Sequence, residues 1–467
     1  MDGRRKPSSH RARIGISIGL VAVMLLAACG DDEKSASTTT GGPQSTGSVT
    51  TLPQTTDLGP GVTADTIKLG VVMVDYSSIA DFVDFSRGDQ KEAFDVFIDD
   101  INKNGGVGGR QLEPFYQEYV PIGPTGPTKA CTTLTEDEKV FATIGVLIDF
   151  TGAAQLCFSK QHKSPLMTSE LTQRMIDEST PGLLLTSGIT AERKTKIQIE
   201  LLDKEGLLEG KKVAIMAETG TKARIDDAIK PAFEALDVQL GTSGVLTTGS
   251  DPDTTAAQQQ LDSFIERWKG ESVNAIFISG LAAVAKTYVN KIKAAMPDVM
   301  LMTDGDSSAQ GAGRDAVAAG ADPNPYEGMY SLVGNNDQTV FESEGVQRCV
   351  KIYEDATGNK VVAPKDLKPG KDGKRAEIWI TVIDACGSTN FFKVIAEKVG
   401  QYLNVNNWIN TVNTFGDLGG KLVDTEFASL GEGKYDAANG FSLVSFDSTI
   451  GTNGDWKVLT PLADVTK

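Results

Sequence analysis

The chain has 467 residues, of which 45 are basic and 62 are acidic, so its formal net charge is −17. A surface this acidic does not suit nucleic acid, whose backbone repels it. Only two histidines occur, His10 and His162, which makes a metal site built on several histidines improbable and leaves few bases for a Ser-His-Asp triad. We therefore expect no metal, no cofactor and no catalytic residues.

The amino terminus has the pattern of an export signal. Basic residues precede an apolar run, Ile14 to Met24, that is shorter than a membrane-spanning helix. The residues Leu26-Ala27-Ala28-Cys29 follow, and they resemble a bacterial lipobox. This resemblance implies that residues 1–28 are a lipoprotein signal peptide and that Cys29 is diacylated. Because the first 28 residues carry a charge of +4, the mature chain would have a charge near −21. A plain signal peptide or an anchor helix is the alternative.

Residues 29–61 are rich in Ser, Thr, Gly and Pro and show no apolar periodicity. Such a segment cannot bury a core, so we expect a disordered tether between a membrane and a globular body. The rest of the chain, residues 62–467, is longer than one hydrophobic core usually serves. We therefore expect two lobes.

The first lobe opens with a strand, a helix and a second strand. Thr66 to Val74 is an apolar run typical of a buried strand. From Arg87 to Asn104, apolar residues recur every three or four positions, as on one face of a helix. Gln111 to Tyr119 is again typical of a strand. This order predicts a βαβ unit and hence a parallel sheet.

Between this helix and the second strand lies the motif Asn104-Gly105-Gly106-Val107-Gly108-Gly109-Arg110. Its asparagine, paired glycines and glycine before a basic residue resemble the periplasmic binding proteins of the leucine/isoleucine/valine type, which are solute receptors of ABC importers. A phosphate-binding role is disfavoured, because these glycines end a helix instead of opening one. The resemblance covers the chain from about Thr66 onward. It implies an α/β fold with two doubly wound parallel-sheet lobes joined by three crossings.

Strands and helices alternate along the next part of the chain in two series of similar size. Strands are predicted at 140–147, 165–169 and 182–187, and then at 212–217, 238–246, 273–279 and 299–303. Helices are predicted at 152–160, 171–177, 191–208, 223–236, 254–268 and 282–295. Beyond residue 330 we expect helices at 338–357, 377–399 and 405–412, and a hairpin of strands at 441–446 and 456–459.

The resemblance implies that the chain crosses between the lobes three times. We expect these crossings near 187–190, near 331–335 and within 415–439. Lobe 1 then consists of residues 62–188 and the helical part 333–415. Lobe 2 consists of residues 189–332 and of the hinge return and terminal hairpin, 416–467.

In open parallel sheets, ligands bind beyond the carboxyl ends of the strands. The loops that follow the predicted strands therefore supply the candidate ligand-binding residues, which are Tyr76, Ser77, Asp149, Phe150, Thr151, Thr168 and Ser169 in lobe 1 and Glu218, Thr219, Asp304 and Asp306 in lobe 2. The resemblance implies that hydroxyl groups such as that of Ser169 hold a ligand carboxylate, and that Asp304 or Asp306 holds an ammonium group. Glu218 stands where the family commonly has an aromatic residue, and the family's paired serines are missing, which speaks against an ordinary branched-chain amino acid.

Four cysteines follow Cys29, and an even count in an exported chain predicts two disulfides. Local pairing is the simplest arrangement, with Cys131 bonded to Cys157 and Cys349 bonded to Cys386, and crossed pairs stay open. The family that the chain resembles carries a bridge of similar spacing in its first lobe. A zinc site is the alternative, but no CxxC spacing supports it.

The resemblance implies an extracytoplasmic solute-binding lipoprotein of an ABC importer, anchored to the cell membrane. It would capture a small polar molecule, such as an amino acid or an amide, by closing its hinge. Its partners would be the solute, a membrane permease and the lipid anchor, and we expect a monomer. A sensory receptor with the same fold is one alternative, although nothing in the sequence resembles an output domain. A surface hydrolase is another, and it would use acids such as Asp304 and Asp306.

Overall fold

The computed structural model describes residues 51–83, 85–169, 171–247, 255–280, 286–334, 337–371 and 373–466. The side chains of residues 81, 82 and 306–308 are not described. The predicted signal peptide, Cys29 and most of the predicted tether therefore lie outside the described residues.

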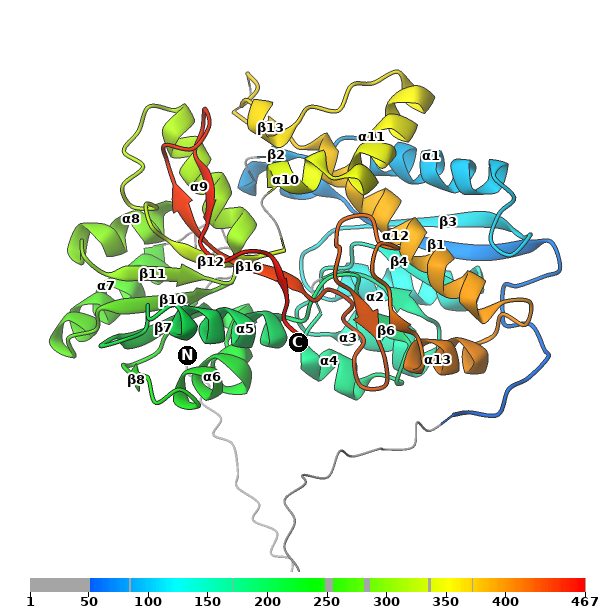
Figure 1. The fold of residues 1–467 in the computed structure, drawn as a ribbon, viewed down its shortest axis with the longest axis horizontal. Helices are drawn as coiled ribbons and strands as arrows, with labels where there is room; N and C mark the ends of the chain where they lie inside the picture. The colour runs from blue at the N-terminus through cyan, green and yellow to red at the C-terminus, as the bar shows by residue number, and fades with distance from the viewer. Residues whose placement is uncertain are drawn as a thin grey trace, which may run out of the picture. The chain divides into compact units, whose positions relative to one another are not determined.

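The sheet of lobe 1 is parallel and has the strand order β3-β1-β4-β5-β6 (Figure 1). Its strands are β1 (Thr66–Val74), β3 (Gln111–Tyr119), β4 (Ala142–Gly145), β5 (Leu166–Met167) and β6 (Leu184–Leu185). The predicted bounds of β1 and β3 are confirmed. In β1, every residue from Leu69 onward is buried, as expected of a central strand that is covered on both faces.

Helices cover the lobe 1 sheet. Three of them contact one another, namely α1 (Gln90–Lys103), α11 (Glu344–Thr357) and α12 (Ile378–Val399), and α13 (Val405–Asn413) packs on α12. The others are α2 (Thr125–Thr132), α3 (Ala153–Leu156), α4 (Gln173–Glu178) and α10 (Asp337–Glu342), which contacts α11. Helix α1 begins three residues later than predicted, because the Asp89 side chain caps it by accepting a hydrogen bond from Glu92 N at 2.9 Å.

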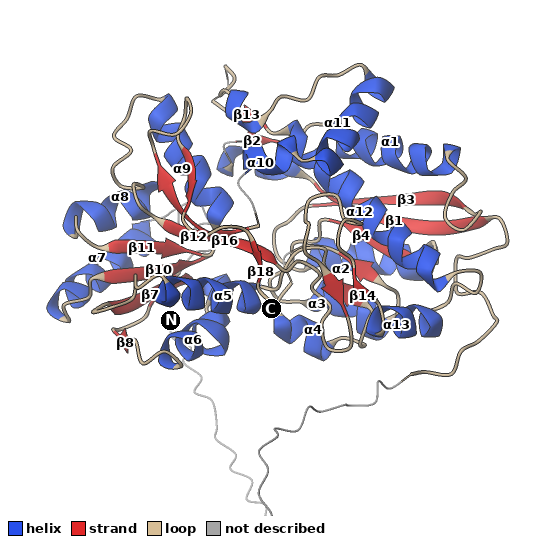
Figure 2. Ribbon diagram, viewed as in Figure 1, coloured by secondary structure: helices blue, strands red, loops and turns tan. Residues whose placement is uncertain are grey.

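The sheet of lobe 2 has the order β17-β16-β12-β11-β10-β7-β8, with β9 beside β7 and β18 beside β16 (Figure 2). Its strands are β7 (Lys212–Glu218), β8 (Gln239–Leu240), β9 (Gly244–Leu246), β10 (Ala275–Ser279), β11 (Met300–Thr303), β12 (Tyr330–Val333), β16 (Gly440–Asp447), β17 (Asp455–Val458) and β18 (Ala463–Asp464). The helices of this lobe are α5 (Ala191–Lys204), α6 (Lys230–Glu234), α7 (Thr255–Gly270), α8 (Lys286–Ala295) and α9 (Asp306–Ala318). The terminal hairpin was predicted, and it joins this sheet through the antiparallel pair β12 and β16.

Three local predictions were wrong. The single helix predicted at 338–357 is two helices, α10 (Asp337–Glu342) and α11, because Ser343 leaves the helical conformation and caps α11 through Val346 N. The strand predicted at 238–246 is divided into β8 and β9 at Thr242, which is held by hydrogen bonds to Glu271. Asp306, which we predict in the loop after the strand at 299–303, is instead the first residue of α9.

The prediction of a disordered tether as far as residue 61 was also wrong. Residues 51–61 lie against lobe 1, where Leu52 N donates to Asn410 Oδ1 at 2.8 Å and Gly59 N donates to Leu403 O at 2.9 Å. The polar composition of this segment did not reveal these contacts, because lobe 1 supplies the side chains that satisfy its main chain.

One helix of the described part, α12, is long and apolar enough to cross a membrane by length and composition. Its apolar side chains are part of the lobe 1 core, where Phe392 stacks on Trp408 with the ring centres 6.0 Å apart. Burial in a core is sufficient to explain this composition.

The structure places two pairs of cysteine sulfur atoms at bonding distance, Cys131 with Cys157 at 2.09 Å and Cys349 with Cys386 at 2.00 Å. These are the local pairs that we predict. His162 lies near the first pair, and these three side chains are the one metal-ligand-like group in the described part of the chain. Sulfur atoms that are bonded to each other do not offer thiolates to a metal, so the zinc alternative loses its ligands.

We expect the double variant Cys131→Ala, Cys157→Ala to lose about 3 kcal/mol of free energy of unfolding, because it frees a loop that the bond closes. Urea unfolding of the variant and the parent chain measures this loss. Peptide mapping without reduction checks the pairing. Free thiols at these four sites, or crossed pairs, would contradict it.

Candidate functional site

The loops that follow the strands of lobe 1 meet at one edge of the sheet. Tyr119, at the end of β3, links two of them: its carbonyl accepts from Asp75 N at 2.8 Å, and its hydroxyl accepts from Ile148 N at 2.7 Å. The buried Thr168 hydroxyl accepts from Leu147 N at 2.8 Å and ties the loop after β5 to the loop after β4. The loops after β1, β3, β4 and β5 are thus brought together at the carboxyl ends of the strands.

Several of the predicted lobe 1 residues use their polar atoms to build these loops. The Ser77 hydroxyl donates to Asp75 Oδ1 at 2.5 Å, and this bond lowers the pKa of the Asp75 carboxyl. The Thr151 hydroxyl donates to Asp149 Oδ1 at 2.7 Å, while Asp149 Oδ2 accepts from Ala154 N at 2.9 Å. These bonds hold tight turns, so Asp149 positions the loop with both of its carboxylate oxygens.

Other predicted lobe 1 residues keep free groups at this edge. The half-buried Ser169 hydroxyl has no hydrogen-bond partner among the described residues. The Phe150 side chain is 42% exposed. Tyr76 is half-buried and packs edge-on against Phe85, with the ring centres 5.8 Å apart.

The structure adds a residue that sequence reasoning missed. The Arg87 guanidinium lies 4.5 Å from the centre of the Phe85 ring and 5.8 Å from the centre of the Tyr76 ring. Its Nη1 forms an ion pair with Glu377 at 3.5 Å, which is too long for a hydrogen bond. Nε and Nη1 are both buried and donate no hydrogen bond. Burying a donor without an acceptor costs free energy, so these two nitrogens could donate hydrogen bonds to a ligand.

Helix α12 presents acids to the same place. The Thr381 hydroxyl donates to Arg87 O at 2.6 Å and packs the start of the helix on this segment. Glu377, Thr381 and Asp384 are four and three residues apart and share one helix face. Asp384 makes no hydrogen bond or ion pair with any residue that the structure describes. Burial raises the pKa of its carboxyl to about 6, the Arg87 charge opposes the rise, and the Asp424 carboxylate adds to it.

We call Tyr76, Phe85, Arg87, Glu377 and Asp384 the lobe 1 cluster. It combines two aromatic faces with a guanidinium whose Nε and Nη1 donate no hydrogen bond, and with the Asp384 carboxylate, whose pKa is raised by burial. The sequence signal for Arg87 was a basic residue after aromatic residues in the loop following the first strand. No sequence signal placed α12 beside it, because that contact joins segments nearly three hundred residues apart.

In lobe 2, Asp304 lies at the carboxyl end of β11 with its side chain only 4% exposed. Its Oδ2 accepts from Ser279 Oγ at 2.7 Å and from Arg224 Nη1 at 3.3 Å, and its Oδ1 accepts from Gly280 N at 2.9 Å. Both oxygens are thus occupied within the lobe. Asp304 could take a ligand ammonium only by giving up some of these bonds.

The other predicted lobe 2 residues lie at the same edge, at the ends of neighbouring strands. Glu218 is half-buried and forms a capping box with Thr221, and its charge adds to the rise that burial causes in the pKa of Tyr288. The exposed Thr219 donates from its hydroxyl to Leu246 O at 3.3 Å. The side chain of Asp306 lies outside the described residues.

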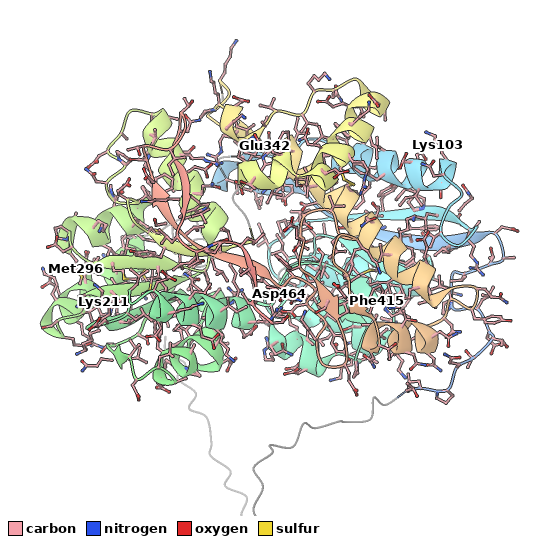
Figure 3. All side chains as sticks on the ribbon, in the orientation of Figure 1. Lys103, Lys211, Met296, Glu342, Phe415 and Asp464 are labelled. Atoms are coloured by element: carbon pink, nitrogen blue, oxygen red, sulfur yellow. A yellow bond between two sulfur atoms is a disulfide. The ribbon has the colours of Figure 1, made fainter. Side chains whose placement is uncertain are left out.

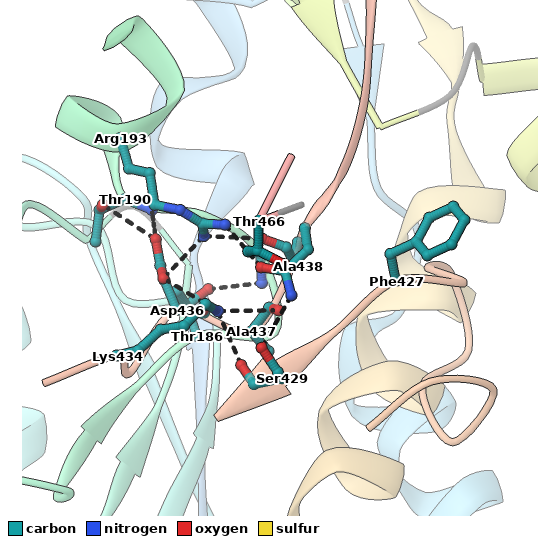
Figure 4. A network of polar contacts seen from close by, with 12 residues as sticks. Thr186, Thr190, Arg193, Phe427, Ser429, Lys434, Asp436, Ala437, Ala438 and Thr466 are labelled. Atoms are coloured by element: carbon teal, nitrogen blue, oxygen red, sulfur yellow. Dashed lines mark hydrogen bonds and ion pairs between the residues drawn. The ribbon is translucent and has the colours of Figure 1, made fainter. Parts of the chain in front are cut away.

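The first and third crossings between the lobes run side by side and share a polar network (Figure 4). Asp436 Oδ1 accepts from Arg193 Nη1 at 3.0 Å, and its Oδ2 accepts from Thr190 N at 3.0 Å and from the Thr190 hydroxyl at 3.1 Å. Main-chain bonds continue the pairing: Ala437 N donates to Thr186 O at 2.9 Å, and Thr186 N donates to Tyr435 O at 3.1 Å. The second crossing, predicted near 331–335, overlaps the end of β12 and continues outside the described residues.

A second link joins the lobes away from these crossings. Arg375, in the short strand β13 (Arg375–Ala376) before α12, forms an ion pair with Asp315 of α9 and another with Glu377 at 3.1 Å. Nearby, Asn453 of the terminal hairpin donates to Leu367 O at 3.4 Å. Because Glu377 also pairs with Arg87, this link is continuous with the lobe 1 cluster.

An open cavity of about 700 Å³ lies on lobe 2, and Val299, Met300 and Leu301 are among its lining residues. These residues lead into the amino end of β11, whereas Asp304 follows its carboxyl end. The cavity is therefore at the opposite edge of the sheet from the predicted site.

No family model and no curated protein sequence matches the chain. Solved structures do match its fold. A solute-binding protein of an ABC transporter from Rhodopseudomonas palustris HaA2, in complex with p-hydroxybenzoic acid, has a TM-score of 0.60 at 17% identity and covers 86% of this chain and 98% of its own. A fatty acid ABC transporter substrate-binding protein from Thermomonospora curvata has a TM-score of 0.59 at 15% identity, with 87% and 95% covered. The leucine-binding protein LivK from Thermotoga maritima has a TM-score of 0.59 at 13% identity, with 85% and 99% covered.

At this level of identity the likeness is one of fold. The chain has the α/β fold of the type 1 periplasmic solute-binding proteins, which confirms the fold expected from the motif at Asn104 to Arg110.

We expect Asp384→Asn to stabilise the protein at pH 7.5 by about 1–3 kcal/mol. The pKa of Asp384 is higher in the folded chain than the ordinary value near 4, so the folded state binds more protons between about pH 4 and pH 6. Stability from this group is therefore present at low pH and is lost as pH rises through that window. Urea unfolding at pH 4.5 and pH 7.5 measures the difference between variant and parent, which should appear only at the higher pH.

The matched control is Asp355→Asn, which removes an exposed ion pair with Lys351 and should change stability by less than about 0.5 kcal/mol. If Asp384→Asn is as stable as the parent chain, or less stable, at pH 7.5, then Asp384 is a structural acid.

Proposed function

We propose that this chain is an extracytoplasmic solute-binding protein of an ABC importer, which captures a small molecule between its two lobes by hinge closure. The fold supports this role, because the solved structures that share it are transporter substrate-binding proteins. Paired crossings near Thr186 and Asp436 leave few covalent restraints between the lobes, which favours rotation about them. A ligand that contacts both lobes binds the closed form more tightly and shifts the population toward it.

The observation that carries the proposal furthest is that two nitrogens of Arg87, Nε and Nη1, are buried and donate no hydrogen bond. Two buried N–H donors between aromatic rings suit an anionic group on a small, partly apolar molecule. The unpaired Asp384 carboxylate suits a cationic or donor group of the same molecule. We therefore propose a small polar ligand that carries a carboxylate, of the amino acid, amide or related class. The molecules named for the three structures above, p-hydroxybenzoic acid, a fatty acid and leucine, all carry a carboxylate.

We propose that Tyr76, Phe150, Ser169 and Glu218 contribute to the same cleft, because each lies at the carboxyl end of a strand. Ser77, Asp149, Thr151, Thr168, Thr219 and Asp304 then act mainly by holding the loops, since their polar atoms bind within their own lobe. A hydrolase gains no support from His162, which pairs with Glu136 at 3.4 Å.

A thermal-shift screen over amino acids, short amides, aromatic acids and fatty acids tests the proposal. A ligand at a hundred times its dissociation constant should stabilise the protein by about 2.7 kcal/mol. With that ligand, we expect Arg87→Met to weaken binding about 10- to 100-fold in calorimetry, because a charged hydrogen bond is lost.

Arg174→Met is the matched control, since Arg174 forms an exposed ion pair with Glu178 on α4. Affinity should be unchanged in it. The absence of any binder in these classes, or equal affinity of the Arg87→Met variant, would count against a carboxylate site at the lobe 1 cluster.

We also propose that the chain is a lipoprotein anchored through Cys29, which lies outside the described residues. The support is the lipobox directly after the apolar run of the export signal. We expect Cys29→Ala to move the protein from the detergent phase to the aqueous phase, or to block its maturation, whereas Ser35→Ala should partition like the parent chain. Unchanged detergent partitioning of Cys29→Ala would exclude the anchor.

A further inference from the structure

The segment of residues 51–61, which we call the N-terminal segment, docks on one face of α13. Three asparagines of lobe 1 define this face: Asn404, which is the N-cap of α13, and Asn407 and Asn410 within the helix. They are three residues apart, so their side chains lie on the same side of the helix. We call them the asparagine face.

The amide groups of the asparagine face bind the main chain of the segment. Asn410 binds both polar groups of Leu52: its Oδ1 accepts from Leu52 N at 2.8 Å and its Nδ2 donates to Leu52 O at 2.9 Å. Asn407 does the same for Thr55, at 3.4 Å and 2.9 Å. Asn404 Nδ2 donates to Asp57 O at 2.8 Å. One asparagine side chain thus imitates the neighbouring strand of a sheet.

An extended segment has no internal partners for its N–H and C=O groups, so these bonds supply what a sheet would otherwise supply. Apolar contacts add to them, because the half-buried Leu52 side chain packs against the lobe 1 core. At its other end the segment is fixed to the sheet. Gly59 N donates to Leu403 O at 2.9 Å, and a Cβ on Gly59 would come within 3.0 Å of the Phe141 ring. The docking therefore continues from Leu52 to the first residues of β1.

We propose that the asparagine face is a docking site for extended polypeptide main chain, and that its occupant is the chain's own N-terminal segment, held on lobe 1. The site binds main-chain groups, so most side chains of the segment can be substituted without loss of docking. This inference does not depend on the proposed ligand or on transport.

Hydrogen exchange of the full chain in detergent, followed at the amides of Leu52 and Thr55, tests the proposal. We expect both amides to be protected in the parent chain. The double variant Asn407→Ala, Asn410→Ala should exchange them about tenfold faster or more, because both lose their acceptors. Thr55→Ala should leave the protection unchanged, because only the main chain of Thr55 is bound.

The matched control on the helix is Asn406→Ala, since the Asn406 side chain makes no hydrogen bond with a described residue. Exchange at Val71 in β1 reports on the fold itself. If the double variant also loses protection at Val71, its fold is disturbed, and the single variant Asn407→Ala tests the proposal instead. Asn407 is only half-buried, so its substitution should leave the fold intact. Exchange of Leu52 and Thr55 at the rate of an open chain in the parent, or no effect of the asparagine variants, would overturn the proposal.

Discussion

The buried carboxylate of Asp436 is the interaction on which the two-lobed arrangement depends. It binds the Arg193 guanidinium and the main chain and hydroxyl of Thr190, so one side chain of the third crossing fixes the first crossing (Figure 4). Arg193 also donates to Ala438 O at 2.9 Å and to Asn439 Oδ1 at 2.7 Å. A buried ion pair adds little net stability, but leaving one partner unpaired is expensive. The network therefore specifies how the two crossings align more than it strengthens the fold.

The ammonium group of Lys434 is partly removed from water by this arrangement, which costs hydration free energy. Its ammonium group donates to the carbonyls of Ser429, at 2.8 Å, and of Asp436. Burial lowers the pKa of Lys434 to about 8, and the Asp436 carboxylate opposes this. Asp464, whose charge also opposes it, lies near the carboxyl end of the chain (Figure 3). The half-buried Lys434 ammonium group thus holds carbonyl groups of the third crossing in place.

The lobe 1 cluster has the opposite character, since Nε and Nη1 of Arg87 donate no hydrogen bond. Folding has placed donors of Arg87 and acceptors of Asp384 in one region without joining them by a hydrogen bond. Evolution tolerates such costs mainly where function needs them, and perturbed carboxyl groups accordingly gather at functional sites.

Periodicity and glycine placement were sufficient to predict the sheet of lobe 1. The elements β1, α1 and β3 are adjacent in sequence, and the spacing of their apolar residues shows which face of each is buried. They were also sufficient to point to the carboxyl edge, where Tyr119 and Thr168 now tie the loops together. They could not identify Arg87 and Asp384 as partners, since that pairing depends on how α12 packs. The break at Ser343 and the docked residues 51–61 were missed for a related reason: their main-chain bonds are satisfied by side chains whose role appears only in the folded chain.

In the proposed lipoprotein, the docked N-terminal segment would limit how far the two lobes can lie from the membrane. A chain free from residue 29 to residue 61 could span at most ~110 Å at about 3.4 Å per residue. Docking of residues 51–61 reduces that limit to ~75 Å, and it assigns the point of attachment to lobe 1. Lobe 1 would then be the lobe whose distance from the bilayer is restricted. A lipid anchor at Cys29 would thus act on lobe 1 directly and on lobe 2 only through the crossings.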